Sequence, residues 1–389
     1  MLLGALVAFG PLAIDLYLPA LPAIARGLSA PAEVVQLSVT VFLAGFSLGM
    51  LFYGPISDRY GRRVVMLGGI LLFVVASLAC MLANTVESLI LARFVQALGG
   101  GAASVLARAV VRDVYPPLEA IRKLSLMAMV TAIAPLLAPL LGSVLLASLG
   151  WRGTFAALLL WGLFSLCVVW LYLPETLPTE RRGQLPLGQA FAIYGRLLLD
   201  PAALGLLLSG GMSFAAMFAY ITASPFYFID LAGFLPASYG LLFATNAIGI
   251  FIANYLNSRL VKSTGAIRMI GLGSTVGFAG ALLLCLASFV SHGLPVVIVG
   301  LFLVVSMTGL LGANCIGLLM AHYPQNAGAA AALFTASQFG LGMLASAAVS
   351  YFHDPSGRSM VWVILVCTAI SLAACLLLRR QQAGLKPPG

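Results

Sequence analysis

Long apolar runs separated by short polar stretches make up almost the whole chain. A bilayer core of about 30 Å is crossed by roughly 20 helical residues, and most of the runs reach that length. The pattern predicts twelve membrane-spanning helices, at residues 2–24, 33–56, 64–83, 86–111, 121–147, 151–173, 203–229, 237–258, 267–290, 294–320, 326–352 and 359–378. The predicted fold class is therefore an all-α membrane protein.

One long polar segment, from Pro174 to Pro201, interrupts this pattern between the sixth and seventh predicted spans. It divides the chain into two six-helix halves, and a weak repeat of Asp58-Arg59 at Asn257-Ser258-Arg259 indicates that the halves are pseudo-symmetric. The predicted domains are an N-terminal bundle at 1–173, a cytoplasmic linker at 174–202, and a C-terminal bundle with a short cytoplasmic tail at 203–389.

A dense cluster of charge lies between the second and third predicted spans. We expect a tight loop there, because Gly54 and Gly61 permit a sharp turn and Pro55 is tolerated where a helix ends. If this loop faces the cytoplasm, the loops and tail on that side hold fifteen of the twenty basic residues, whereas the opposite loops hold Arg26, Arg152 and Arg358. Positive residues accumulate on the cytoplasmic side, so both termini are predicted there.

The composition agrees with a membrane protein and excludes several other classes. With 62% hydrophobic and 8% charged residues, the chain has far fewer charges than the usual soluble domain. The net charge of +9 is explained by basic loops, so no nucleic-acid partner is expected. The six cysteines lie in apolar runs without a C-x-x-C pair, and His292, His322 and His353 fall near helix ends in separate loops. The sequence therefore predicts no metal, no cofactor and no enzyme activity.

Asp15 is the one acid of the eleven that sits well inside a predicted span. An ionisable residue at that depth is a functional-site candidate. Counting 1.5 Å per residue from the outer helix ends puts Asp15 roughly 12 Å deep and Arg93 roughly 9 Å deep. We therefore predict that the two residues meet and form a proton-coupling pair. Two alternatives stay open, namely a structural carboxylate and an arginine bonded to backbone carbonyls.

Four charged residues are predicted to form a gate at the inner membrane face: Asp58, Arg59, Arg62 and Asp113. A salt bridge between the charged loop and Asp113 would hold the second and fourth spans in one conformation. Asp58 could instead sit at the positive N-terminus of a neighbouring helix. A further alternative is that these charges only set topology.

The fifth span carries a candidate hinge at Pro135, Pro139 and Gly142. Two prolines one turn apart remove backbone hydrogen bonds and bend a helix, while small residues allow close packing. A bend here could seal one side of a transport path.

Several local matches resemble one family of membrane transporters. They are Ile14 to Pro22, Tyr53 to Arg63, Arg93 to Gln96, Arg112 to Pro116, Pro174 to Pro178, and Ser213 to Phe218. Through them the chain resembles the Bcr/CflA group of drug:proton antiporters in the major facilitator superfamily, and most of all the bicyclomycin-resistance exporters.

This resemblance implies roles for the charged residues. Asp15 corresponds to the family's helix 1 carboxylate, Arg93 to its helix 4 arginine, and Arg62 with Asp113 to its gating pair. The chain departs from the family pattern where alanines and a serine replace helix 5 glycines, and where Val7 replaces a second helix 1 acid found in some relatives. The resemblance also implies a monomer in the bacterial inner membrane.

The resemblance places the binding cavity near the midplane, between the two halves. The candidate lining residues are aromatic or amide side chains at Tyr17, Phe214, Phe218, Tyr220, Asn246, Asn314, Phe334 and Gln338. Each aromatic residue could instead serve helix packing alone. An apolar cavity with few polar groups would suit amphiphilic molecules.

The function implied is export of small amphiphilic antibiotics, such as bicyclomycin and chloramphenicol-like compounds, from cytoplasm to periplasm in exchange for protons. Two alternatives remain: an exporter of an endogenous amino acid or peptide, and a facilitator without proton coupling.

Overall fold

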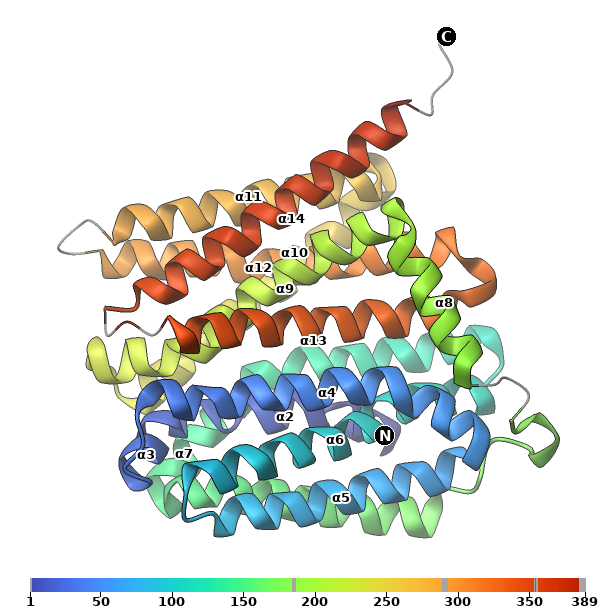
Figure 1. The fold of residues 1–389 in the computed structure, drawn as a ribbon, viewed down its shortest axis with the longest axis horizontal. Coiled ribbons are helices and arrows are strands. Elements are labelled where there is room, and N and C mark those ends of the chain that lie inside the picture. Colours follow the sequence, from blue (N-terminus) through green and yellow to red (C-terminus); the bar gives the residue numbers. More distant parts are fainter. Residues whose placement is uncertain (1, 184–186, 289–292, 353, 355, 385–389) are drawn as a thin grey trace. The chain divides into compact units, whose positions relative to one another are not determined.

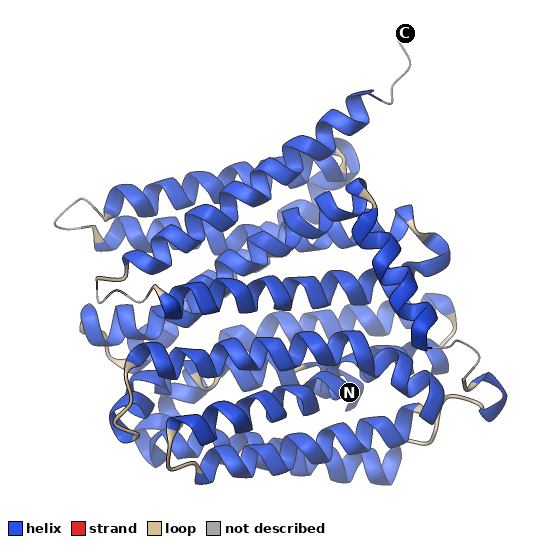
Figure 2. Ribbon diagram, viewed as in Figure 1, coloured by secondary structure: helices blue, strands red, loops and turns tan. Residues whose placement is uncertain are grey.

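The structure is a computed structural model that describes residues 2–183, 187–288, 293–352, 354 and 356–384. These residues form helices joined by short turns, and no strand occurs among them (Figures 1 and 2). His292, His353 and the last five residues of the predicted tail lie outside the described part.

Ten helices of the described part are long and apolar enough to cross a membrane. They are α4 (Ala32–Tyr60), α5 (Arg62–Leu82), α6 (Val86–Val114), α7 (Pro117–Tyr172), α9 (Pro201–Pro225), α10 (Pro236–Thr264), α11 (Ala266–Ala287), α12 (Leu294–His322), α13 (Ala327–Tyr351) and α14 (Arg358–Gly384). The shorter elements are α1 (Leu2–Val7), α2 (Phe9–Asp15), η1 (Leu18–Ala20), α3 (Leu21–Gly27), η2 (Thr179–Arg181), α8 (Leu187–Leu199), η3 (Phe226–Leu231) and η4 (Pro324–Asn326).

Two features account for the difference between these ten helices and the twelve predicted spans. Helix α7 has 56 residues and contains Gly150 at φ 69° and ψ −176°, so it is two spans joined at a turn. The first span is broken into α1, α2, η1 and α3, each too short to be counted alone. With both features included, the prediction of a twelve-helix, all-α membrane fold is confirmed.

The chain forms two compact units. Unit 1 comprises Met1–Ala190 and Phe228–Ala244, and unit 2 comprises Phe191–Tyr227 and Thr245–Gly389. In unit 1, Phe9 of α2 packs edge-on against Phe73 of α5, with ring centroids 4.7 Å apart. In unit 2, α9 lies against α13, and a hydrogen bond of 2.8 Å joins Thr222 to Ser346 across them. The domain boundaries inferred from the sequence stay a prediction.

The expected loop at the charged stretch 54–63 is wrong in extent. Helix α4 continues through Pro55 to Tyr60, only Gly61 leaves the helix, and α5 begins at Arg62. Gly61 adopts φ 98°, a conformation that glycine reaches without a Cβ penalty. Within the last turns of α4, the Ser57 hydroxyl donates to the Gly54 carbonyl at 2.7 Å. The turn therefore needs one residue rather than ten.

The break in the first span follows from its prolines. Pro19 has no N–H, so the Asp15 carbonyl cannot accept the usual helical bond from it, and α2 ends at Asp15. The backbone instead forms the shorter, three-residue hydrogen bonds of a 3₁₀-helix. The Tyr17 N–H donates to the Ile14 carbonyl at 3.3 Å, and the Ala20 N–H donates to the Tyr17 carbonyl at 3.0 Å. The predicted membrane carboxylate thus lies at the point where its helix unwinds.

Candidate functional site

Asp15 is almost fully buried, with 4% of its surface exposed. No ion pair of the described residues includes it, so the structure does not place its carboxylate against Arg93 as we expected. The physical reason is helix geometry. Arg93 donates a hydrogen bond to the Ala13 carbonyl of the first span. Asp15 is two residues after Ala13, so it lies about 200° further around the helix axis. Asp15 therefore lies on a different face of the first span from Ala13, which Arg93 contacts.

Arg93 is fully buried in a cage of aromatic rings and hydrogen-bond acceptors. Its Nη1 donates to the Ala13 carbonyl at 3.0 Å and to the Gln96 side-chain oxygen at 2.6 Å. Its guanidinium carbon lies 4.2 Å from the ring centroid of Phe42 and 4.5 Å from that of Tyr17. Such stacking stabilises a desolvated cation. The alternative of an arginine bonded to a backbone carbonyl describes part of this arrangement.

Two nitrogen atoms of the Arg93 guanidinium are not hydrogen-bonded within the described part of the chain. Its Nε and Nη2 have no hydrogen-bond partner among the described residues. The Gln96 amide is held in place by donating to the Ser77 hydroxyl at 2.8 Å, and that hydroxyl donates to the Phe73 carbonyl at 2.7 Å. The network joins α2, α5 and α6. Ser77 was missed by the sequence analysis, because a single serine in an apolar span has no distinguishing pattern.

Tyr17 takes part in this packing rather than lining an open space. Its side chain is fully buried, and its hydroxyl is hydrogen-bonded to the Ser38 hydroxyl of α4. The Tyr17 ring also packs 5.4 Å from that of Phe155, measured between centroids. Its predicted contact with substrate stays a prediction.

The cluster predicted for the inner membrane face, called the inner ion-pair cluster below, consists of Asp58, Arg62 and Asp113. The Arg62 guanidinium lies 2.7 Å from the Asp58 carboxylate and 2.9 Å from that of Asp113, measured from Nη1 and Nε. It also donates to the Ser57 hydroxyl at 2.5 Å. The cluster joins the ends of α4, α5 and α6. Arg59 lies outside it: its side chain is exposed and its guanidinium lies 5.5 Å from the Tyr60 ring centroid.

Glu175 supports this cluster from the segment after α7. Its carboxylate accepts hydrogen bonds from the backbone N–H groups of Arg62 at 2.9 Å and Arg63 at 3.3 Å, which are the free donors at the start of α5. It also accepts from Leu177 at 3.0 Å and lies 3.6 Å from Arg182. Partial burial raises the pKa of Glu175, but these donors together hold it below its usual value.

Glu175 was not among the residues predicted to form the gate. A signal was present, because an acid that follows a span can satisfy the positive N-terminus of a neighbouring helix. A side chain at Gly61 would come within 2.3 Å of the Glu175 carboxylate, so the glycine also makes room for the acid. In addition, the Gly183 N–H donates to the Asp58 carbonyl at 3.0 Å.

The predicted hinge in α7 packs directly on the broken first span. A Cβ added to Gly142 would lie 2.1 Å from the Leu16 carbonyl oxygen, so the two backbones touch at the residue after Asp15. Pro135 and Pro139 both lie inside α7. A Cβ on Gly240, at the start of α10 in unit 1, would lie 3.4 Å from the Pro139 carbonyl oxygen. The hinge residues therefore lie against two other helices.

An ion pair that the sequence did not predict joins Arg26, at the end of α3, to Asp230 in η3. The Nη1 to Oδ1 distance is 2.9 Å, and both residues belong to unit 1. Both side chains are exposed, so the pair adds little stability by itself.

Two of the predicted lining residues of unit 2, Phe214 and Phe218, lie among aromatic rings. An aromatic cluster forms from Phe214, Phe218 and Phe339, with centroids 5.1 Å apart for the first pair and 5.3 Å for Phe214 and Phe339. Phe339 was missed, although it adjoins the predicted residue Gln338. Phe334 packs elsewhere, over Gly210, where it occupies space that a side chain would need.

The predicted amide residues differ in their partners. Asn314 donates to the Asn257 side-chain oxygen at 2.7 Å and to the Leu310 carbonyl at 2.9 Å, so its amide is already engaged within unit 2. Asn246 is buried, and its side-chain nitrogen has no hydrogen-bond partner among the described residues. Tyr220 is buried as well, and Gln338 is half-buried. Among the described residues the amide nitrogen of Asn314 is thus engaged and that of Asn246 is not, and contact of either residue with a substrate stays a prediction.

The sequence matches the family model of the Major Facilitator Superfamily over residues 1–347. The uncharacterized MFS-type transporter YdgK of Bacillus subtilis is 33% identical over 98% of this chain and 96% of its own. A bicyclomycin resistance protein homolog of Haemophilus influenzae is 28% identical over 96% of this chain and 94% of its own. A chloramphenicol resistance protein of Pseudomonas aeruginosa is 33% identical over 71% of this chain and 65% of its own.

The fold is also similar to solved transporter structures. A crystal structure of the peptide transporter POT in complex with sulfate superposes with a TM-score of 0.77, over 98% of this chain and 94% of its own. The sequences are 15% identical, so this likeness concerns the fold alone.

Proposed function

The chain belongs to the Major Facilitator Superfamily, and on that premise we propose that it exports small amphiphilic antibiotics from cytoplasm to periplasm in exchange for protons. It is a multi-pass membrane transporter rather than an enzyme. Relatives named for resistance to bicyclomycin and chloramphenicol support an antibiotic substrate.

The observation that carries proton coupling is the position of Asp15. It is a buried acid at the end of α2, where the helix unwinds, and the next residue touches the hinge glycine of α7. A change in the bend of α7 would therefore move the backbone beside the carboxylate. This arrangement can link a proton on Asp15 to a conformational change.

In the proposed cycle, a substrate entering from the cytoplasmic side displaces a proton from Asp15. After the transporter opens outward and releases the substrate, Asp15 takes up a proton from outside. Arg93 stays charged within its aromatic cage and holds α6 to the first span. The inner ion-pair cluster and the Arg26–Asp230 pair would form and break as the two membrane faces close and open.

The aromatic cluster supports an amphiphilic substrate. Its three rings offer an apolar surface, and Gly342 lies close beneath, since a Cβ there would be 3.1 Å from Phe218. Aromatic walls with few polar groups are typical of sites for drug-sized molecules. Asn246 would supply a hydrogen bond to a polar group of the substrate.

Proton release from everted membrane vesicles with an acid interior tests the proposal. Adding bicyclomycin or chloramphenicol should release protons from vesicles that contain the wild type but not from those with Asp15→Asn. The matched control is Glu87→Gln, which removes an exposed acid in the first turn of α6. Equal release by the wild type and Asp15→Asn would keep antiport but remove Asp15 as the coupling group.

Two other outcomes select the rival functions. Drug flux without any proton release would identify an uncoupled facilitator. Proton release by a labelled amino acid or peptide, with none by the antibiotics, would identify a metabolite exporter.

A further inference from the structure

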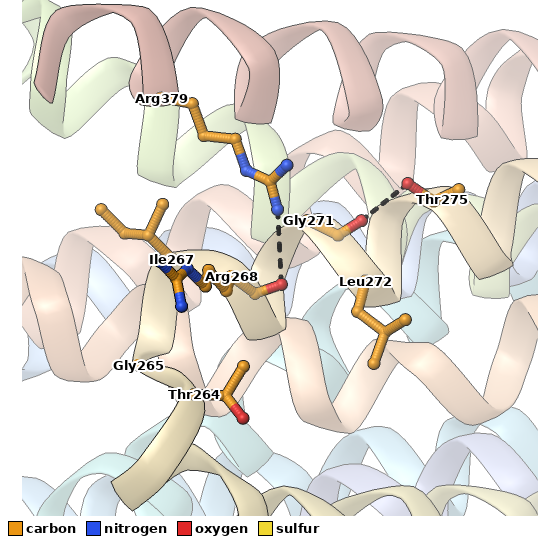
Figure 3. A pocket seen from close by; sticks show the side chains of 8 residues that line it. All are labelled: Thr264, Gly265, Ile267, Arg268, Gly271, Leu272, Thr275 and Arg379. Atoms are coloured by element: carbon orange, nitrogen blue, oxygen red, sulfur yellow. Dashed lines mark hydrogen bonds between the residues drawn. The ribbon is translucent and has the colours of Figure 1, made fainter. Parts of the chain in front are cut away.

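A basic groove lies on unit 2, between the end of α14 and the start of α11 (Figure 3). Its volume is about 770 Å³, and it is separate from every residue assigned to transport above. The lining residues are Thr264, Gly265, Ile267, Arg268, Gly271, Leu272, Thr275 and Arg379. Helices α11 and α14 pack side by side, as a hydroxyl contact of 3.5 Å between Ser274 and Ser371 shows.

The two arginines of the groove have no acidic partner. No ion pair of the described residues includes Arg268 or Arg379, and both side chains are exposed. Unit 2 contains only two acids. Asp200 caps the start of α9 and is hydrogen-bonded to Tyr323, while Asp354 precedes the opposite end of α14. The groove is therefore a concave patch of positive charge without neutralisation.

A helix N-terminus adds to this charge. Helix α11 has 22 residues, and Gly265 at its N-cap supplies no side chain to its first N–H groups. Open N–H groups and the helix dipole favour an anion at such a terminus. Gly265, Arg268 and Arg379 thus bring three anion-binding features to one cavity.

The floor of the groove is shaped by a glycine. A Cβ on Gly271 would lie 1.7 Å from Nη2 of Arg379, so only glycine lets this guanidinium rest on the surface of α11. There it makes one long hydrogen bond, of 3.4 Å, to the Arg268 carbonyl (Figure 3). Most of its donors remain available to a ligand.

The same groove has an apolar side. Leu272 lines it and is 52% exposed. Further exposed leucines continue along the two helices that form it: Leu282 and Leu286 on α11, and Leu376 and Leu377 on α14. A free anion would gain nothing from this surface, whereas an acyl chain would cover it. The combination of a charged end and an apolar wall points to a lipid rather than to a soluble ion.

We propose that this groove binds an anionic phospholipid, with its phosphodiester between Arg268, Arg379 and the start of α11. The predicted orientation places these helix ends in the cytoplasmic leaflet, where anionic lipid headgroups meet basic pockets between helices. The site does not depend on the identity of the transported substrate.

The test uses the purified full-length protein, stripped of lipid and then titrated with phosphatidylglycerol or phosphatidylcholine under native mass spectrometry. Phosphatidylglycerol should bind the wild type more tightly than phosphatidylcholine. Each of Arg268→Gln and Arg379→Gln should weaken its binding about fivefold. Arg380→Gln is the matched control, because it removes the neighbouring exposed arginine of α14 that does not line the groove.

A second variant separates the groove from general surface charge. Gly271→Leu keeps every arginine but fills the floor and displaces the Arg379 guanidinium, so it should also weaken phosphatidylglycerol binding. Equal losses in Arg379→Gln and Arg380→Gln, or no loss in Gly271→Leu, would overturn the proposal. Displacement of phosphatidylglycerol by millimolar inorganic phosphate would overturn the lipid as the occupant and leave a phosphate site.

Discussion

Arg93, the most deeply buried arginine of the site, is held by neutral groups, whereas the buried Arg62 is held by two carboxylates. Arg93 rests on two rings, a carbonyl and an amide, and Asp15 is included in no ion pair of the described residues. A salt bridge between them would favour the ionised carboxylate and so oppose its protonation. The absence of such an ion pair among the described residues is compatible with the proton exchange proposed for Asp15.

The amide of Gln96 is expected to stabilise the buried arginine measurably. Gln96→Leu removes the acceptor that lies 2.6 Å from Arg93 Nη1, and a hydrogen bond to a charged group contributes about 1.5–3 kcal/mol. We expect a lower thermal midpoint in detergent for this variant. The control is Gln36→Leu, since the buried side-chain oxygen of Gln36 has no partner in the described part of the chain. Equal losses in both variants would contradict the assigned role.

Glu175 is expected to make stability depend on pH. Because its pKa is held below the usual value in the folded protein, its contribution is present above that usual value and is lost as the pH falls through the folded pKa. The thermal midpoint of the wild type should therefore exceed that of Glu175→Gln at pH 7, and the gap should close in acid. Glu119→Gln, at the exposed start of α7, is the control and should show no such closing gap.

At the scale of single elements, two glycines that both lie inside helices have opposite surroundings. Gly142 of α7 touches the Leu16 carbonyl, whereas nothing lies within 4 Å of a Cβ placed on Gly68 of α5. The first glycine is required by packing and the second is not. The broken first span and the proline-bearing α7 therefore behave as one packed pair.

This contrast predicts opposite effects of the same substitution. Gly142→Ala should destabilise the protein by about 1–3 kcal/mol through overpacking and should impair transport. Gly68→Ala should be neutral or stabilise by up to about 1 kcal/mol, because alanine favours a helix. Thermal unfolding and drug uptake into vesicles measure both effects. Full activity and stability in Gly142→Ala would show that the contact is dispensable.

At the scale of the whole molecule, antiport of a neutral drug against one proton moves one net charge per cycle. A membrane potential then adds about 2.3 kcal/mol per 100 mV, which corresponds to roughly 50-fold greater drug accumulation. An imposed potential without a pH gradient should therefore drive uptake of a neutral antibiotic into everted vesicles. Asp15→Asn should abolish the dependence of uptake on the membrane potential. If uptake by the wild type does not change with the potential, exchange of one neutral drug molecule for one proton is excluded.

Much of the fold could be predicted from the sequence, but less of the site could. The spans were recovered within a few residues, and Asp15, Arg62, Arg93 and Asp113 were recognised as unusual. The Arg62–Asp113 ion pair is present, while no ion pair of the described residues joins Asp15 to Arg93. The contacts of Glu175, Phe339 and Asp230 were missed, because each depends on a partner far away in the sequence.

The sequence by itself determined the number of spans and their approximate limits, and it predicts which side carries the positive charge. Hydropathy decides these features locally, since a bilayer requires each backbone to pair its polar groups within a helix. Only the tertiary structure decided which charges meet. One residue turns a helix face by about 100°, and hydropathy does not reveal where a span breaks, as the first span does after Asp15, or where two backbones touch, as they do at Gly142.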